Sequence, residues 1–156
     1  MADLKVTTTS GEDAVLGGNA IDQFKPSLRG DILSSTDNGY DAARKVWNGM
    51  IDKRPALIVR CSGVADVISA VRFARDHDLL VSVRGGGHNV AGSAVCDGGL
   101  VIDLSLMKGV HVDPVQRTAR AQPGASLGDL DHETQAFGFA VPAGIVTTTG
   151  IAGLTL

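Results

Sequence analysis

The chain has 156 residues, of which 44% are hydrophobic, 20% are charged and 4% are aromatic. This composition is ordinary for a globular protein, and the length suits one domain or part of one. The net charge of −3 comes without a basic stripe, so we expect no nucleic-acid partner. No apolar run approaches the roughly 18 residues of a membrane span, and no signal peptide is visible, so we expect no membrane partner and a cytoplasmic location. The two cysteines, Cys61 and Cys96, are expected to be reduced thiols.

The N-terminal part of the chain carries weak patterns. Residues 1–15 are polar and predict a flexible terminus ahead of a domain that spans residues 16–156. Apolar residues at helical spacing predict short helices within residues 19–29 and 40–47. The second helix contains Tyr40 and Trp47, and we expect both side chains to pack in the core.

A β-α-β unit is predicted between residues 56 and 83. Residues 56–59 and 79–83 are short apolar runs typical of buried strands, and we expect them to be parallel. Ser62 is the candidate N-cap of the helix between them. The apolar residues that predict the buried face of this helix are Val64, Val67, Ile68, Val71 and Ala74. Ligands bind at the carboxyl ends of strands in open sheets of this kind, so the residues after position 83 are of interest.

Three consecutive glycines follow the second strand at residues 85–87. Such a run permits positive φ and close approach of the backbone to a ligand, and its N–H groups can form a nest for phosphate oxygens. Arg84 adds a positive charge, and His88 could act as a nucleophile or metal ligand. A flexible surface loop is the alternative. A dinucleotide fingerprint would need glycine in place of Val90, and a Walker loop has no match.

The remaining elements predict a mixed sheet and a second ligand-facing segment. Strands are predicted at residues 100–103, 109–113, 118–121 and 139–141, and Ser126 with Asp129 predicts a capped helix with Leu127, Leu130 and Phe137 on its buried side. The closing segment, residues 142–156, places three threonines between glycines and predicts a surface that a flat ligand can approach; the alternative is a polar loop before a final strand. The segment stops in an apolar run, which predicts a chain cut inside a domain. The fold class is therefore α+β with α/β character, a β-α-β unit plus a mixed sheet.

The ordered motifs of the chain resemble a known family. They are Arg54-Pro55, Ile58-Val59-Arg60, Val83-Arg84-Gly85-Gly86-Gly87-His88-Asn89, Asp97-Gly98-Gly99, Val101-Ile102-Asp103-Leu104-Ser105, Pro123-Gly124-Ala125 and the segment from Gly144 to Gly153. Together they resemble the FAD-linked oxidases of the vanillyl-alcohol-oxidase or p-cresol-methylhydroxylase (PCMH) type, and most of all the berberine-bridge-enzyme-like oxidoreductases. The resemblance runs from about residue 40 to the end. It implies the N-terminal portion of a PCMH-type FAD-binding domain, truncated at its C-terminus and without a substrate domain.

The resemblance also implies a set of FAD-binding residues. His88 would bond covalently to the 8α carbon of the flavin, and Val146 stands where some relatives carry a second, cysteinyl link. The implied phosphate contacts are Arg84, Gly85, Gly86 and Gly87. The remaining FAD surface would be lined by Asn89, Gly92, Ser93, Gly124, Gly144, Thr148, Thr149, Gly150 and Gly153. No catalytic base is identified, since family members draw it from a part that is absent here, and no metal site is expected.

The implied function is that of an oxidoreductase module. An intact relative would transfer a hydride from a small organic substrate, such as an alcohol or amine, to covalent FAD, with O₂ as the acceptor. The alternative is a truncated, non-catalytic fragment that binds FAD weakly or not at all and self-associates through its unfinished edge, near Leu154 and Leu156. A reductase with non-covalent flavin is a third reading, which the histidine in the loop disfavours.

Overall fold

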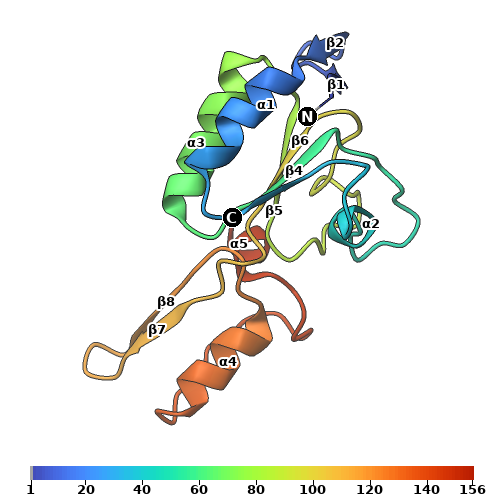
Figure 1. Cartoon of the computed structure of the whole chain (residues 1–156). Helices are drawn as coiled ribbons and strands as arrows, with labels where there is room; N and C mark the ends of the chain where they lie inside the picture. Colours follow the sequence, from blue (N-terminus) through green and yellow to red (C-terminus); the bar gives the residue numbers. More distant parts are fainter. Residues whose placement is uncertain (1) are drawn as a thin grey trace.

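The structure, a computed structural model, describes residues 2–156 and centres on a four-stranded sheet (Figure 1). The strands of this sheet lie in the order β3 (Asp31–Leu33), β4 (Leu57–Arg60), β6 (Leu100–Asp103) and β5 (Val81–Arg84). β4, β6 and β5 run parallel, whereas β3 pairs antiparallel with β4. The predicted α+β fold with a mixed sheet is confirmed.

The other elements surround this sheet. The helices are α1 (Gly18–Phe24), α2 (Tyr40–Ala43), α3 (Val64–Asp76), α4 (Leu127–Gln135) and α5 (Ile151–Thr155), with a 3-10 turn at Lys25–Ser27. Two hairpins pair β1 (Leu4–Thr7) with β2 (Asp13–Leu16) and β7 (Val110–Asp113) with β8 (Thr118–Ala121). Within residues 2–156, no helix combines the length and the apolar character that crossing a bilayer requires.

The predicted β-α-β unit is present, but its two strands are not neighbours. β4 leads into α3 and α3 into β5, while β6 lies between the two strands and pairs with both. The residues of β6 are all buried, whereas Val81 and Val83 of β5 are exposed. Burial on both faces suits an inner strand of a parallel sheet. β5 therefore takes the edge, and the loop that follows it is open to solvent.

The alternation of side chains along β4 separates two hydrophobic cores. Leu57 and Val59 point toward α1 and α3, where the rings of Phe24 and Phe73 stack at a centroid distance of 4.1 Å. Ile58, between them in sequence, points to the opposite face and packs with residues around α2. Figure 1 shows α1 and α3 on one side of the sheet and α2 on the other. Each fully buried aliphatic side chain contributes about 1.5–3 kcal/mol.

The N-terminal residues form a hairpin instead of the flexible terminus that their polarity predicted. Val6 and Leu16 are each only 3% exposed, because both pack in the core of α1 and α3. The N–H of Thr7 donates to the carbonyl of Gly98, and the N–H of Leu80 donates to the carbonyl of Thr7. These long-range bonds, which no local pattern reveals, hold the hairpin against the strands.

The buried face of α3 was predicted correctly only in part: Ala74 is buried and Val67 packs against the core, as expected. Val64, Ile68 and Val71 are exposed, whereas Ala70 and Phe73 are buried. The helix is rotated because its N-terminal region is fixed by a buried carboxylate: Asp66 accepts hydrogen bonds from the N–H groups of Arg29, Gly30 and Ser62. The N-cap is Gly63, and the Ser62 hydroxyl, the predicted cap, donates to Asp66 instead.

The helix predicted at residues 40–47 is shorter than expected. α2 ends at Ala43, and Tyr40 is buried as predicted, with its hydroxyl donating to the carbonyl of Pro55 at 2.7 Å. Trp47 was predicted to lie in the core, but its side chain is 63% exposed. Because the chain leaves helical geometry after α2, Trp47 projects toward the loop that follows β5.

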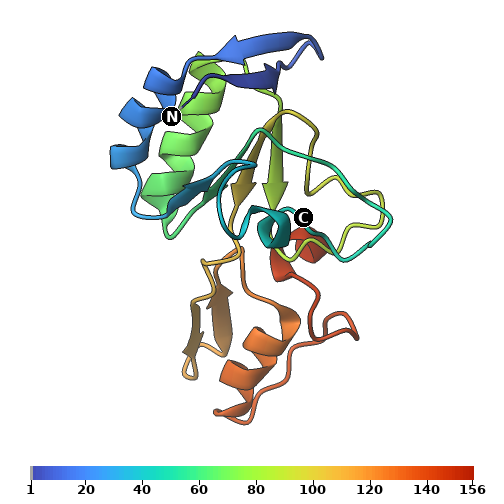
Figure 2. The same cartoon turned by 45° about the vertical axis from the view of Figure 1, so that its right-hand side comes forward.

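The C-terminal third forms a second lobe below the sheet. Figure 2 shows the hairpin of β7 and β8 beside the orange helix α4, with the red helix α5 near the ends of the central strands. The capping box of Ser126 and Asp129 is confirmed, and Leu127 and Leu130 are buried. Phe137 is 49% exposed because α4 ends before it. The expected strand at residues 139–141 is irregular, and the chain ends in α5, where the alternative reading of the closing segment had a final strand.

Candidate functional site

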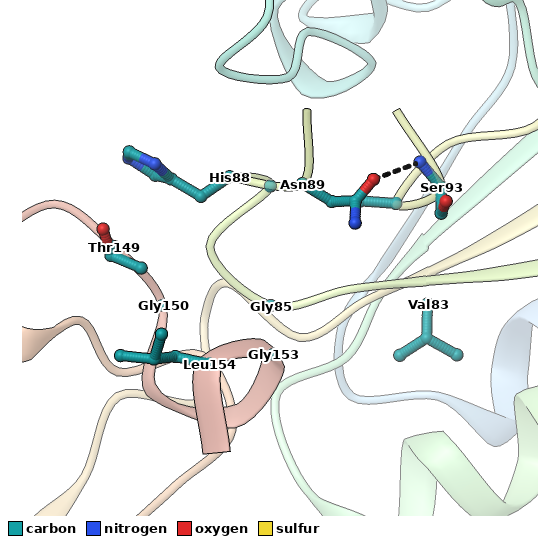
Figure 3. A pocket seen from close by; sticks show the side chains of 11 residues that line it. Val83, Gly85, His88, Asn89, Ser93, Thr149, Gly150, Gly153 and Leu154 are labelled. Atoms are coloured by element: carbon teal, nitrogen blue, oxygen red, sulfur yellow. Dashed lines mark hydrogen bonds between the residues drawn. The ribbon is translucent and has the colours of Figure 1, made fainter. Parts of the chain in front are cut away.

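A pocket of about 310 Å³ lies at the carboxyl end of β5 (Figure 3). It is formed between the glycine–histidine loop, residues 85–93, and the closing segment, residues 142–156. The predicted site residues that line it are Gly85, Gly87, His88, Asn89, Ser93, Thr149, Gly150 and Gly153. Val83, Ala94 and Leu154 also line it and were not predicted. The structure therefore brings together two segments that are about sixty residues apart, as the His88–Thr148 pair shows.

The two segments meet through glycine backbones. A Cβ atom on Gly86 would lie 2.4 Å from the backbone nitrogen of Gly150, and a Cβ on Gly85 would lie 2.8 Å from the carbonyl oxygen of Pro123. Gly87 adopts a φ of +66°, which other residues rarely adopt. The glycines at positions 86 and 150 therefore permit contact between the two protein segments, and those at 85, 87 and 150 line the pocket.

The turn of the glycine–histidine loop leaves backbone donors available. Within residues 2–156, the N–H groups of Gly86, Gly87 and His88 have no hydrogen-bond acceptor. Successive free N–H groups in a turn create a small region of positive potential that favours an anionic oxygen. Farther along, the carboxamide oxygen of Asn89 accepts from the N–H of Ser93 at 3.2 Å, which fixes the next turn of the loop (Figure 3).

His88 is the single titratable side chain among the described residues that line the pocket. Its Nε2 atom lies 3.1 Å from Oγ1 of Thr148. Its ring stacks on the indole of Trp47, with centroids 5.3 Å apart and planes inclined by 22°. Trp47 was missed as a site residue because it precedes His88 by more than forty positions and has no motif around it. Thr148 was predicted to line the FAD surface. It contacts His88 but does not line the pocket itself.

Arg84 is placed outside the pocket. Adjacent residues of a strand point to opposite faces, so Val83 reaches the pocket and Arg84 points toward α2. The guanidinium donates to the carbonyl of Ala43, and within the described chain its buried Nε has no acceptor. It lines a separate cavity of about 300 Å³ with Arg60 and Asp103. Because side chains alternate along β5, Arg84 does not face the glycine–histidine pocket.

Three further predicted glycines lie around the pocket without lining it. Gly92 packs against the side chain of Ile51. Gly124 packs against the backbone of Leu104, which lies beneath the loop. Gly144 lies beside Leu154 and lines another cavity, of about 770 Å³, between α4 and α5.

Both cysteines are free and buried, and the environment of each disfavours the reactive thiolate. Burial raises the pKa of the Cys61 thiol to about 12, assisted by the nearby carboxylates of Asp66 and Asp103. Burial also raises the pKa of Cys96, which accepts a hydrogen bond from the Ser82 hydroxyl at 3.4 Å. Both thiols are therefore protonated at neutral pH, and neither forms a disulfide, as expected. His88 is the group in this region that is chemically suited to nucleophilic attack.

Comparison with known proteins agrees with this geometry. Residues 55–156 match the family described as the FAD binding domain. (R)-6-hydroxynicotine oxidase of Paenarthrobacter nicotinovorans is 42% identical over 130 residues, which are 83% of this chain and 28% of that protein. An FAD-linked oxidoreductase of Dictyostelium discoideum is 36% identical over 137 residues, covering 87% of this chain and 30% of that protein. The chain therefore spans less than a third of the length of these relatives.

A solved structure gives the same result for the fold. The crystal structure of 6-hydroxy-D-nicotine oxidase from Arthrobacter nicotinovorans aligns with 82% of this chain and 28% of its own, with a TM-score of 0.80 and 42% identity. The resemblance inferred from the ordered motifs is confirmed. The chain belongs to the FAD-binding-domain family of FAD-linked, berberine-bridge-enzyme-like oxidoreductases.

Proposed function

We propose that this chain holds FAD covalently through His88 and serves an oxidoreductase that transfers a hydride from a small organic substrate to the flavin, with O₂ as the acceptor. The observation that carries the proposal is the position of the His88 imidazole. It lies on the wall of the pocket, beside a turn whose N–H groups are free to bind an anion. A nucleophile and an anion site are thus adjacent, as a covalently held dinucleotide requires.

The pocket has the features that an FAD molecule needs. The N–H groups of Gly87 and His88, which both line the pocket, would bind pyrophosphate oxygens, since successive backbone donors favour negative charge. The side chains of Val83, Ala94 and Leu154 supply an apolar wall. A volume of about 310 Å³ is at the low end of the roughly 300–1,000 Å³ of ligand pockets. We therefore propose that this chain binds part of the cofactor and that a longer protein would cover the rest.

His88 would act as the nucleophile in flavin attachment. An unprotonated imidazole nitrogen of His88 would form a C–N bond with the 8α carbon of bound flavin. The attachment would remove one hydrogen from the imidazole and one from the 8α methyl group, and O₂ would accept both together with the two electrons, giving hydrogen peroxide. A covalent bond prevents loss of the cofactor. The residues of this chain then bind and orient the flavin, whereas hydride acceptance is the chemistry that bound FAD supplies.

The catalytic base of the proposed reaction would lie outside this pocket. His88 is the one titratable group in the described pocket lining, and the covalent bond occupies one of its nitrogens. A base that removes a proton from the substrate would therefore come from another segment of the working oxidoreductase. The chain's share of the function is cofactor binding.

A second candidate function is self-association of the chain by itself. Leu154 is 51% exposed and Leu156 is fully exposed, and the cavity of about 770 Å³ beside them is lined by apolar residues of α4 and α5. Apolar surface of this kind favours association. Light scattering over a range of protein concentrations tests this reading: a mass that rises with concentration supports it, and a constant monomer mass contradicts it.

Purification of the chain after expression with FAD available tests the main proposal. The expected result is a yellow protein whose flavin remains bound after acid precipitation. His88→Ala should lose the acid-stable flavin and keep reversibly bound FAD. A colourless wild-type protein that takes up no FAD would contradict the assignment of cofactor binding to this chain.

A further inference from the structure

Trp47 is the single tryptophan of the chain, and its indole lies against the ring of His88. The segment that carries it is fixed to the glycine–histidine loop. The N–H of Trp47 donates to the carbonyl of Gly87 at 3.0 Å, and the side-chain amide of Asn48 donates to the carbonyl of Val90 at 2.8 Å. These two bonds flank His88 in the loop. The stacking is therefore supported by the backbone on both sides and does not depend on the ring contact alone.

Thr148 holds the edge of the same imidazole ring. Its hydroxyl lies 3.1 Å from Nε2 of His88, and its two neighbours are fixed to the start of α4. The N–H of Gly128 donates to the carbonyl of Thr147 at 2.8 Å, and the N–H of Leu127 donates to the carbonyl of Thr149 at 2.9 Å. The hydroxyl of Thr148 thus projects from a segment whose backbone is held on either side.

The two contacts restrict the ring in complementary ways. Stacking on Trp47 fixes the plane of the imidazole, and the hydrogen bond at Nε2 fixes its rotation within that plane. Within residues 2–156, the Nδ1 atom of His88 has no hydrogen-bond partner. The hydroxyl of Thr148 can donate to Nε2 or accept from it, and in either case loss of this hydrogen bond would alter the balance between the two tautomers.

The exposure of Trp47 favours a positioning role over a structural one. A tryptophan that is 63% exposed contributes little to the hydrophobic core. Its ring stacks on that of His88, and neither hydrophobic core contains it. We propose that Trp47 and Thr148 are positioning residues that fix the orientation of the His88 imidazole, and influence its tautomer balance, for bond formation with the flavin. This inference rests on the proposed covalent attachment.

The chain offers conservative variants and matched controls. Trp47→Ala removes the stacking, whereas Trp47→Phe keeps an aromatic ring. Thr148→Val removes the hydroxyl, whereas Thr148→Ser keeps it. Thr147→Val is the matched control for Thr148, because it makes the same change one residue away from the hydroxyl that reaches His88.

The first measurement needs no flavin. Long-range ¹H–¹⁵N correlation spectra of the FAD-free protein report the tautomer of each histidine ring, and His88→Ala assigns the His88 signals. Thr148→Val should shift the tautomer balance of His88, and Thr147→Val should leave it unchanged. Unaltered His88 spectra in both Trp47→Ala and Thr148→Val would overturn the inference.

The second measurement is the rate at which added FAD becomes acid-stable. Trp47→Ala and Thr148→Val should each slow attachment roughly two- to ten-fold, as expected when an aromatic pair or hydrogen bond that orients the nucleophile is lost. Trp47→Phe and Thr148→Ser should stay near the wild-type rate. Wild-type rates in both Trp47→Ala and Thr148→Val would contradict the inference. If the wild type itself forms no acid-stable flavin, the covalent proposal fails, and the spectra alone decide whether the two residues position the ring.

Discussion

Gly86 and Gly150 contact each other backbone to backbone, so close that a Cβ on Gly86 would lie 2.4 Å from the nitrogen of Gly150. The carbonyl of Ala125 accepts from the N–H of Ile151 at 3.0 Å and anchors the start of α5 beside this contact. The contact joins the glycine–histidine loop to the closing segment. The pocket wall formed by Thr149, Gly150 and Gly153 therefore depends on two residues without side chains.

Gly150→Ala should separate the two pocket walls. A methyl group has no room there, so the segments must move, at a cost of about 1–3 kcal/mol in unfolding free energy. FAD affinity should also fall, because the two pocket walls would move apart. Urea unfolding and FAD titration measure both effects. Gly49→Ala is the control, because nothing lies within 4 Å of a Cβ at that position. Equal stability and FAD affinity in Gly150→Ala and Gly49→Ala would contradict the close contact.

Asp66 should make the protein sensitive to acid. Burial raises the pKa of this carboxyl, but hydrogen bonds from Arg29, Ser62 and Gly30 outweigh burial and hold the pKa below its usual value of 3.8. A lowered folded-state pKa stabilises the protein above the unfolded-state pKa, and this contribution is lost as the pH falls through the folded-state pKa.

Asp66→Asn should therefore lower the unfolding free energy by about 1–3 kcal/mol at neutral pH, through the loss of charge-assisted hydrogen bonds. The variant should also lose less stability than the wild type on acidification. Urea unfolding from neutral to acidic pH tests both statements. Asp76→Asn, at a largely exposed position beside Arg75, is the control and should change stability little. Parallel pH profiles for the wild type and Asp66→Asn would refute the role of this carboxylate.

Cys61 and Cys96 should resist thiol reagents in the folded protein. Both side chains are buried, and burial raises the pKa of each thiol, to about 12 for Cys61. Reaction requires the thiolate, so labelling by a disulfide reagent at mildly alkaline pH should be slow. Denaturation should release two reactive thiols, the full cysteine content. Fast labelling of the native protein would show that these side chains are more accessible than the structure indicates.

Features encoded by neighbouring residues were predictable from the sequence. The capping box of Ser126 and Asp129, the hairpin of β7 and β8 and the strand–helix–strand order around α3 all follow from short patterns. The glycine–histidine loop was predictable as a ligand-binding segment because its residues are consecutive. The closing segment was predictable as a second ligand-facing segment from its threonines and glycines.

Features that depend on distant contacts were not predictable in the same way. The stacking of Trp47 on His88 joins residues more than forty positions apart, and Trp47 has no pattern that distinguishes it from a core residue. The buried face of α3 was predicted only in part, because the carboxylate of Asp66 binds backbone N–H groups of residues 29 and 30, far away in sequence. Arg84 follows Val83 in β5 and therefore points to the opposite face, so its place next to the glycines in sequence does not bring it into the pocket.

The central claim is that His88 holds the flavin covalently, and acid precipitation tests it most directly. Wild-type protein, incubated with FAD and air, should give a precipitate that keeps its flavin colour and fluorescence after washing, in an amount that approaches one flavin per chain. His88→Ala should give a colourless precipitate under the same treatment. Complete release of flavin from the wild type, or equal retention by His88→Ala, would contradict the assignment.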